Sequence, residues 1–190
     1  DKIIMLLFVG LGNPSPNSEN NRHNIGFKII DAINQKFGLS NQKPKFKGLL
    51  TTGTINGRKV YAIKPLTFMN NSGICIRELI EYFKIEAENV IVFHDDLDID
   101  FGKIKTKFGG SSAGHNGIES IDKFIGKDYS RVRIGIGHPK NNIEVSDHVL
   151  QDFNEDEKIE LSSMTENITK SLPILIDKKL DLFSSTVNNK

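Results

Sequence analysis

The chain of 190 residues has no tryptophan and a single cysteine. One cysteine cannot form an internal disulfide, which is typical of proteins kept in a reducing compartment. Cys75 lies in the apolar stretch ICIRELIEYF, where we expect a buried small side chain rather than a nucleophile. The cysteine content therefore predicts a cytoplasmic protein.

Long hydrophobic runs are also missing. No apolar run reaches the roughly 18 residues that a membrane-spanning helix needs. The first residues, DKIIMLLFVG, are apolar only briefly and lack the basic segment and cleavage site of a signal peptide. We interpret them as a buried first strand and expect no membrane partner.

Neither sign of charge is in clear excess. The chain has 25 basic and 24 acidic residues, and its net charge is +1. Binding to nucleic acid would therefore need a local basic patch. With 37% hydrophobic residues the chain can form a core, and its length fits one domain. We expect a single domain over residues 1–190, with 184–190 as a frayed polar tail.

Apolar periodicity predicts strands that alternate with helices. Strands are expected over residues 3–9, 49–55, 59–63, 90–93, 103–108 and 132–136, and helices over 25–37, from the loop 65–71 to about 83, over 117–125, and after Asn154. Asn56-Gly57 predicts a type I′ hairpin turn. Asn154 with Glu157 predicts a helix start, and Pro173 an interruption of that helix. The predicted fold class is α/β: one three-layer α/β/α domain around a mixed, mostly parallel twisted sheet.

Polar residues follow several predicted strands. Asn13 follows the first, Asn70 follows the hairpin, Asp95 ends the apolar strand 90–93, and Asn116 ends a glycine-serine loop. In open α/β sheets, sites form at the carboxyl ends of strands, so we expect these side chains to converge. Turn chemistry, helix capping and solvated carboxylates would explain each residue taken alone.

Two His-Asn pairs stand before predicted helices, in RHNIGF and in GHNG. The positive end of a helix should lower the pKa of His23 and keep its imidazole neutral, as a base requires. Asp95 is the best placed carboxylate to orient that ring. His115 should lie in a flexible loop, where the neighbouring Asn116 is the more useful residue.

Three further motifs would indicate dinucleotide binding, a serine nucleophile or a metal site, but each supports that chemistry only in part. The stretch Gly10–Gly12 resembles a dinucleotide-binding loop, but Ser15 occupies the third glycine position. Gly110–Gly114 matches the G-x-S-x-G elbow, which leaves a serine esterase with Ser112 as nucleophile open as an alternative. The carboxylates of residues 94–100 permit a hard cation but do not specify one.

Lys103, Lys105 and Lys107 alternate along one predicted strand, so they should share a face. Arg131 and Arg133 alternate in the same way on a later strand. A basic strip beside an amide-rich loop favours phosphate as partner. A solvated sheet face explains the same pattern.

Taken together, four segments resemble the bacterial peptidyl-tRNA hydrolases. They are VGLGNPSPNSENNRHNIGF (9–27), KPLTFMNNSG (64–73), HDDLDIDFGKIKTKFGGSSAGHNGIESI (94–121) and YSRVRIGIGHP (129–139). The combination is specific, although each segment alone is not.

The resemblance implies a monomeric, metal-independent hydrolase without a cofactor that cleaves the ester between a peptide and the terminal ribose of tRNA. It implies that His23 is the catalytic base and that Asp95 is its partner. It also implies two sets of binding residues. The peptidyl end would be bound by Asn13, Asn70, Asn116 and Met69, and tRNA phosphate by Lys103, Lys105, Lys107 and Arg133.

Two departures from the family pattern bear on these roles. Ser18 stands where the family usually has a tyrosine, which puts substrate contacts there in doubt. Ser111, Ser112 and Ala113 interrupt a loop that is usually almost all glycine, so its backbone should be more restricted. A non-catalytic RNA-binding module is a second alternative, although it would not need a paired histidine and aspartate.

Overall fold

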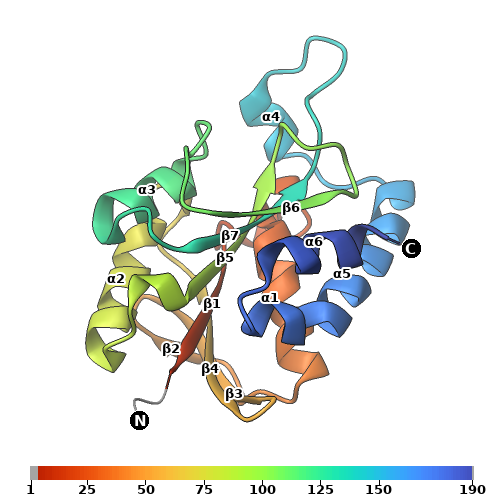
Figure 1. Ribbon diagram of the computed structural model, residues 1–190. Coiled ribbons are helices and arrows are strands. Elements are labelled where there is room, and N and C mark those ends of the chain that lie inside the picture. Colours follow the sequence, from red (N-terminus) through yellow and green to blue (C-terminus); the bar gives the residue numbers. More distant parts are fainter. Residues whose placement is uncertain (1–3, 190) are drawn as a thin grey trace.

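A computed structural model describes residues 4–189, and its centre is a seven-stranded twisted sheet in the order β2-β3-β4-β1-β5-β7-β6 (Figure 1). The strands are β1 (Leu6–Gly10), β2 (Lys43–Lys45), β3 (Gly48–Ile55), β4 (Arg58–Pro65), β5 (Val90–Asp96), β6 (Ile104–Phe108) and β7 (Ser130–Gly135). β1 pairs in parallel with β4 and β5, and β5 pairs in parallel with β7. Antiparallel pairings, β2–β3, β3–β4 and β6–β7, complete both edges.

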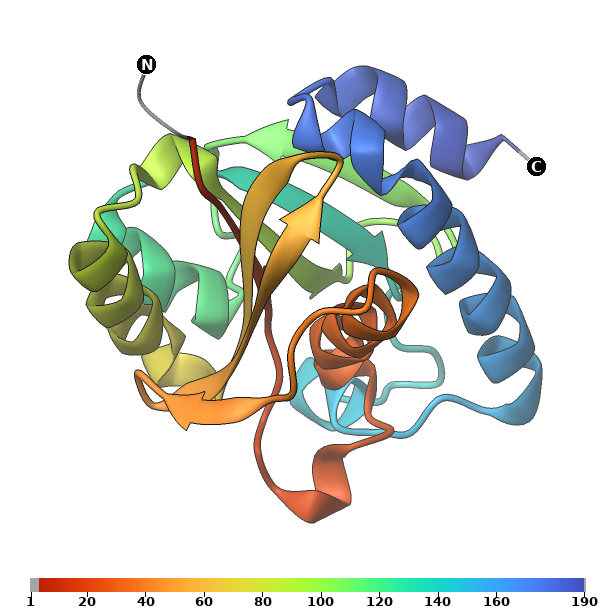
Figure 2. The ribbon, with the colours of Figure 1, turned by 90° about the horizontal axis from the view of Figure 1, so that it is seen from below.

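Helices cover both faces of the sheet, as Figure 2 shows from below. The helices are α1 (Ile25–Lys36), α2 (Ser72–Phe83), α3 (Asn116–Ile125), α4 (Val145–Val149), α5 (Glu155–Ile176) and α6 (Leu180–Asn188). One hydrophobic core joins the sheet to α1, α5 and α6, and a second joins its other face to α2 and α3. Every residue of β1 and β5 is buried because both faces of these central strands are covered. The predicted three-layer α/β class is confirmed.

Local signals predicted several elements well. Asn56 and Gly57 have φ values of 50° and 77°, and they connect β3 to β4 as a type I′ turn requires. Asn154 caps α5 in a reciprocal capping box with Glu157. Cys75 is fully buried in α2.

Other expectations were wrong. Pro173 does not interrupt α5, which continues to Ile176. The expected tail 184–190 is helical in α6 as far as Asn188, whose side chain bonds both the backbone N–H and the carbonyl of Ile104 in β6. Tertiary contact with the exposed edge of β6 thus orders a segment that looks polar and frayed. Lys190, like Ile3 of the first predicted strand, lies outside the described residues.

Two short elements, β2 and α4, were not predicted, and short 3-10 turns join the larger elements. The turns are η1 (Pro16–Ser18), η2 (Arg22–Asn24), η3 (Met69–Asn71) and η4 (Ala87–Asn89). Within residues 4–189, no helix combines the length and apolarity needed to cross a bilayer.

Candidate active site

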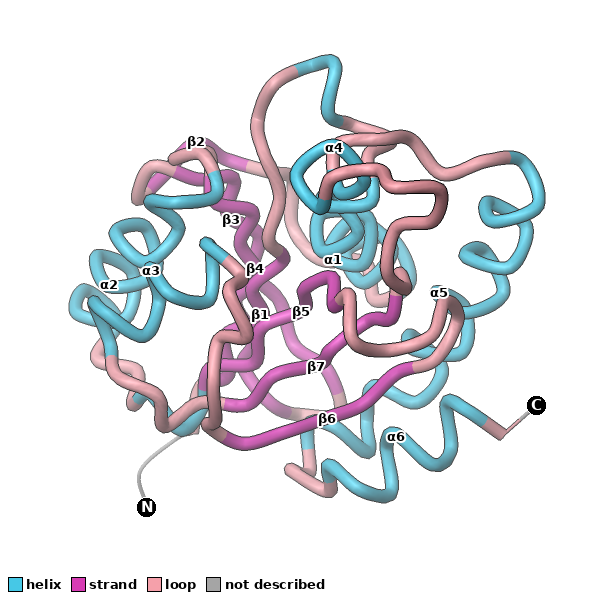
Figure 3. The backbone as a smooth tube through the Cα atoms, turned by 90° about the horizontal axis from the view of Figure 1, so that it is seen from above, coloured by secondary structure: helices cyan, strands magenta, loops and turns pink. Residues whose placement is uncertain are grey.

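Within the described residues, polar side chains from seven segments line one cavity of about 760 Å³ at the carboxyl ends of the central strands. Figure 3 views this end of the molecule, where loops and α4 surround the ends of β1 and β5. The predicted convergence is confirmed, because the cavity is lined by Asn13, His23, Met69, Asn70, Asp95 and Asn116. Further lining residues, which no motif had singled out for catalysis, are His94, His115, Phe68 and several side chains of α4.

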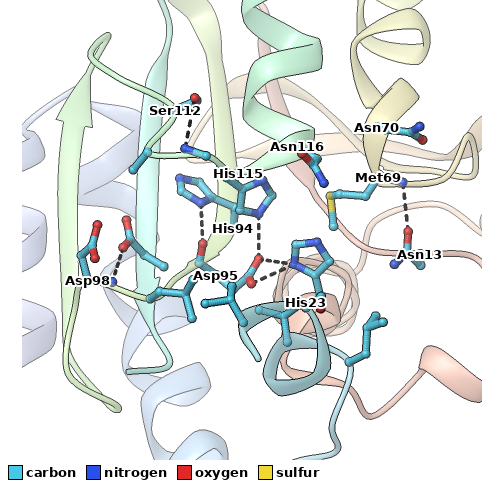
Figure 4. A pocket seen from close by; sticks show the side chains of 18 of the residues that line it. Asn13, His23, Met69, Asn70, His94, Asp95, Asp98, Ser112, His115 and Asn116 are labelled. Carbon is cyan, nitrogen blue, oxygen red and sulfur yellow. Dashed lines mark hydrogen bonds and ion pairs between the residues drawn. The ribbon is translucent and has the colours of Figure 1, made fainter. Parts of the chain in front are cut away.

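His23 and Asp95 are in direct hydrogen-bond contact in this cavity. The Nδ1 of His23, in η2, lies 2.8 Å from Oδ2 and 3.0 Å from Oδ1 of Asp95, at the end of β5 (Figure 4). Asp95 is 3% exposed, whereas the side chain of His23 retains 12% exposure. Because the carboxylate accepts at Nδ1, the neutral ring carries its proton there, and the lone pair of Nε2 is left free to act as a base.

Gly26 allows the start of α1, which follows His23, to pack closely against the ends of β1 and β5. A Cβ on Gly26, in the first turn of α1, would lie 2.3 Å from the backbone nitrogen of Leu11 and 2.5 Å from the carbonyl oxygen of Phe93. A side chain at this position would push α1 away from the ends of β1 and β5. The glycine of the RHNIGF stretch therefore allows His23 to reach Asp95.

His115 is the second imidazole bound to Asp95. Its Nε2 lies 2.8 Å from Oδ1 of Asp95, while its Nδ1 accepts from the backbone N–H groups of Gly117 and Ile118. These two donors require the lone pair at Nδ1, so Nε2 carries the proton and donates it to the carboxylate. The His115 ring caps α3 and contacts Asp95, so it is held in place at the site, whereas the greater usefulness of Asn116 stays a prediction.

The charges of this cluster are set by mutual contacts. Burial would raise the pKa of Asp95, but the nearby imidazoles of His23 and His115 and their hydrogen bonds hold it well below its usual range. Burial also lowers the pKa of His23, yet the charge of Asp95 and its hydrogen bond outweigh burial and raise this pKa above its ordinary value. The expected depression by the helix end is therefore wrong in sign, because a carboxylate in contact outweighs a partial dipole charge.

His94 packs behind the cluster as a neutral ring. Burial, with the neighbouring His115, lowers its pKa to about 3. Its Nδ1 donates to the backbone carbonyl of Asp95 at 2.8 Å, and its ring meets that of His115 edge-on with centroids 5.0 Å apart. His94 therefore supports the backbone of Asp95 and one side of His115 without adding charge.

Asn13 is held in a single orientation. Its backbone N–H and carbonyl both bond the side-chain amide of Asn24, each at 2.9 Å, and its own Oδ1 accepts from the backbone N–H of Met69. With Oδ1 occupied, the amide nitrogen of Asn13 is the group available to a ligand. Asn24, 1% exposed, went unnoticed in the sequence, where its only signal is its place in the RHN motif.

Asn70 and Asn116 lie on the same side of the cavity (Figure 4). Among the described residues, neither side-chain amide makes a hydrogen bond, so both are available to a ligand. Phe68, just before η3, has φ 56° and ψ 158°, a region that non-glycine residues rarely adopt. Phe68 is 59% exposed and Met69 is 5% exposed, and both line the cavity.

Comparison with known proteins agrees with this arrangement. The family model for peptidyl-tRNA hydrolase matches residues 7–190. The peptidyl-tRNA hydrolase of Pelagibacter ubique (strain HTCC1062) is 81% identical, covering 98% of this chain and 100% of that protein. The peptidyl-tRNA hydrolase of Ehrlichia canis (strain Jake) is 46% identical over 96% of this chain and 94% of its own length.

The chain belongs to the peptidyl-tRNA hydrolase family. A solved structure of the peptidyl-tRNA hydrolase from Acinetobacter baumannii superposes with a TM-score of 0.91 at 32% identity, covering 100% of this chain and 97% of the other. The family therefore accounts for both the sequence motifs and the fold that brings them together.

The predicted basic strip of this peptidyl-tRNA hydrolase lies outside the cavity. Lys105 is exposed on β6 and lies opposite Arg133 on β7, so the two side chains share a face. Lys107 is exposed on the same face, whereas Lys103, also exposed, precedes the strand. Arg133 is not a free cation, because its Nε donates to Oδ2 of Asp96 at 2.9 Å.

The interrupted glycine loop of this peptidyl-tRNA hydrolase places a residue with a Cβ in a left-handed conformation. Ala113 has φ 48°, a left-handed conformation that costs a residue with a Cβ about 1–2 kcal/mol. Ser112 lines the cavity, but its Oγ accepts from the N–H of Gly114 and makes no hydrogen bond to a histidine nitrogen among residues 4–189. A serine nucleophile at Ser112 would therefore lack a base.

His23, Asp95 and His115 place their ligand atoms within 4.8 Å of one another, close enough to raise the question of a metal ion. The hydrogen bonds of His115 disfavour a metal ion at this position. A cation bound at its Nε2 would move the ring proton to Nδ1, directly against the N–H donors of Gly117 and Ile118. The hydrogen-bond pattern fits a proton-transfer cluster better than a metal site.

Proposed function

We propose that this peptidyl-tRNA hydrolase uses His23 as the general base that activates water for cleavage of the peptide–tRNA ester, with Asp95 as its partner. One observation carries the proposal. The 2.8 Å contact to Asp95 occupies Nδ1 of His23 and leaves Nε2, at the cavity, without a hydrogen-bond partner among the described residues. A base positioned in this way typically contributes about 10²- to 10⁴-fold to the rate.

In this mechanism Nε2 of His23 removes a proton from water, and the resulting hydroxide attacks the ester carbonyl. Asp95 remains ionised and stabilises the imidazolium that forms. The imidazolium then gives its proton to the departing ribose oxygen. The products are tRNA with a free ribose hydroxyl and a peptide carboxylic acid, which loses its proton to solvent, and His23 is neutral again.

Three asparagines supply hydrogen bonds to the reacting ester. The amides of Asn70 and Asn116 have no partner within the described residues, and the nitrogen of Asn13 is directed by its bond to Met69. We assign Asn70, with nearby backbone amides, to the negative oxygen of the tetrahedral intermediate. A donor of this kind contributes about 3 kcal/mol. Asn13, Asn116 and Met69 hold the peptidyl end.

The tRNA itself would be bound by the exposed cations beside the cavity. Lys105 and Lys107 present ammonium groups on one face of β6, with Lys103 next to them. Arg133 contributes on the same face, although Asp96 offsets part of its charge. Phosphate contacts of this type carry much of the affinity for nucleic acids.

We further propose that the enzyme acts as a cytoplasmic monomer without a metal or cofactor. The single buried cysteine supports a reducing compartment. The tautomer of His115 supports a metal-free site. Sedimentation of the purified protein tests the monomer, and turnover that a strong chelator halves or abolishes would contradict the metal-free mechanism.

The deciding experiment is cleavage of peptidyl-tRNA by the wild type and by His23→Ala, with tRNA binding measured in parallel. We expect turnover to fall by about 10²-fold or more while binding stays within a few-fold. Turnover within a few-fold of wild type would show that His23 is not the base.

Ser112→Ala serves as the comparison, because loss of activity there, together with labelling by a fluorophosphonate, would favour the serine esterase instead. Wild-type protein that binds tRNA but releases no peptide would favour the RNA-binding module.

A further inference from the structure

We propose that Arg22 is a positioning residue that holds the α4 wall of the cavity against the turn carrying His23, and thereby sets the affinity for the peptide part of the substrate. The proposal rests on the proposed function of the cavity. It assigns a role to a buried arginine that takes no part in proton transfer. Arg22 immediately precedes His23 in η2 and is only 8% exposed.

The guanidinium of Arg22 bonds three acceptors that lie far away in the sequence. Nη1 donates to the backbone oxygen of His148 at 3.2 Å and to Oε1 of Gln151 at 3.4 Å. Nη2 donates to Oε1 of Glu157 at 3.0 Å. One side chain therefore connects the catalytic turn to the end of α4, to the following loop and to the start of α5.

Backbone contacts also connect the turn that carries His23 to residues 151–153. The N–H of Arg22 donates to the carbonyl of Gln151 at 3.0 Å, and Asn21 forms an isolated bridge with Asp152. The ring of Phe153 lies 5.9 Å from the guanidinium carbon. The backbone bonds attach residues 151–153 to the turn, but within this set of contacts only the side chain of Arg22 reaches back to α4.

The α4 helix matters because its side chains form an apolar wall of the cavity. Val145 and Val149 line the cavity from α4, and Leu150 lines it from the next position. Apolar side chains suit the peptide rather than the phosphates of peptidyl-tRNA. A helix of five residues is too short to be stable alone, so its position depends on tertiary contacts. The carbonyl that Arg22 bonds belongs to His148, directly beside Val149.

Arginine is required for this role rather than a generic cation. Its planar fork bonds several acceptors at once, whereas a lysine ammonium at the same place could retain Glu157 but not all three partners. Asp95 holds His23 independently of this tether. Loss of the tether should therefore weaken peptide binding and leave the chemical step largely intact.

The test compares Arg22→Lys with wild type on two substrates, tRNA carrying one acetylated amino acid and tRNA carrying an acetylated tetrapeptide. We expect KM for the tetrapeptide substrate to rise about tenfold, the size expected for losing hydrogen bonds to a charged group. KM for the short substrate should rise less, and kcat for both should stay within about twofold. Arg58→Lys is the matched control, because Arg58 lies at the β3–β4 turn, far from the cavity in the sheet, and forms an ion pair with Asp177.

Hydrogen exchange gives a second readout that does not depend on activity. In Arg22→Lys the amides of residues 145–151 should exchange faster, while those of α2 stay as in wild type. Equal KM changes for both substrates, a fall in kcat without a change in KM, or unchanged exchange in 145–151 would each overturn the proposal. If His23→Ala kept full turnover, the proposed function would fail, yet exchange in 145–151 would still test the tether.

A partner variant covers the case in which Arg22→Lys does not fold. Gln151→Ala removes one acceptor and leaves the buried guanidinium paired with Glu157. It should raise KM for the tetrapeptide substrate in the same direction by a smaller factor. Where both variants fold, their combined effect should be less than additive, because both loosen the same contact. An unchanged KM in Gln151→Ala, or full additivity of the pair, would count against the tether.

Discussion

The imidazole of His115 donates a hydrogen bond of 2.8 Å from Nε2 to Oδ1 of Asp95. The same carboxylate accepts from Nδ1 of His23. Asp95 is thus shared by two imidazoles, and the backbone donors at Nδ1 of His115 fix the direction of one of the two bonds. This geometry makes the properties of His23 depend on a residue 92 positions away in a different loop.

The first prediction concerns pH. Because Asp95 raises the pKa of His23, the protonated and inactive form persists to a higher pH than for a free histidine. The value of kcat/KM should therefore rise with pH through an apparent pKa above about 6.5, the usual value for histidine, and fall about tenfold per pH unit below it. A profile measured from pH 5 to 9 checks this, and a midpoint below that of free histidine would contradict the sign.

Asp95→Asn should reverse that shift. Without the carboxylate, burial dominates and lowers the pKa of His23, so the acidic limb should move to lower pH. Turnover should also fall by about 10²-fold or more, because the imidazolium loses its stabilising charge. The pH profile of the variant separates the two effects. An acidic limb at the wild-type position would mean that Asp95 does not set the pKa of the base.

His115→Ala should raise the pKa of His23 further. Removing this donor leaves Asp95 with one hydrogen bond fewer, so its charge is less stabilised and attracts the proton on His23 more strongly. We expect the acidic limb to move up in pH and turnover at neutral pH to fall by about tenfold, roughly one hydrogen bond to a charged group. An unchanged pH profile would limit His115 to capping α3.

The left-handed conformation of Ala113 predicts a stabilising substitution. Ala113→Gly removes the clash of a Cβ at φ 48° and should leave the protein equally stable or up to about 1 kcal/mol more stable. Ala87→Gly, in the 3-10 turn η4, is the control and should destabilise by about 0.5–1 kcal/mol, because glycine there only adds freedom to the unfolded chain. Urea unfolding of both variants measures the difference. Equal losses of stability in the two would refute strain at Ala113.

If the basic strip binds tRNA phosphates, it should contribute to the salt dependence of tRNA affinity. Replacing Lys103, Lys105 and Lys107 together by alanine should weaken tRNA binding and flatten the plot of log affinity against log salt concentration by about 0.9 per lost phosphate contact. Lys43→Ala with Lys45→Ala, on the exposed strand β2, provides the comparison at the opposite edge of the sheet. The strip has no role in tRNA binding if its variant keeps the wild-type slope.

Much of the fold followed from short-range patterns. The apolar runs of β1 and β5, the Asn56-Gly57 turn and the Asn154 cap depend on residues a few positions apart, so the sequence predicted them. It also predicted that polar residues after successive strands would meet, because parallel strands end at one edge of a sheet.

Contacts over long separations could not be predicted in this way. The bonds from Arg22 to His148 and Glu157 span 126 and 135 residues, and no local pattern marks them. The pairing of Arg133 with Asp96 and the helix at residues 184–188 likewise depend on which surfaces the fold brings together.

The sequence by itself determined which chemical groups this peptidyl-tRNA hydrolase carries and at which strand ends they stand, because alternation and capping are local properties of the chain. Only the tertiary structure decided that Asp95 serves two histidines and that His23 has a raised pKa. A hydrogen bond and a pKa depend on distances of about 3 Å between side chains, and packing alone sets those distances.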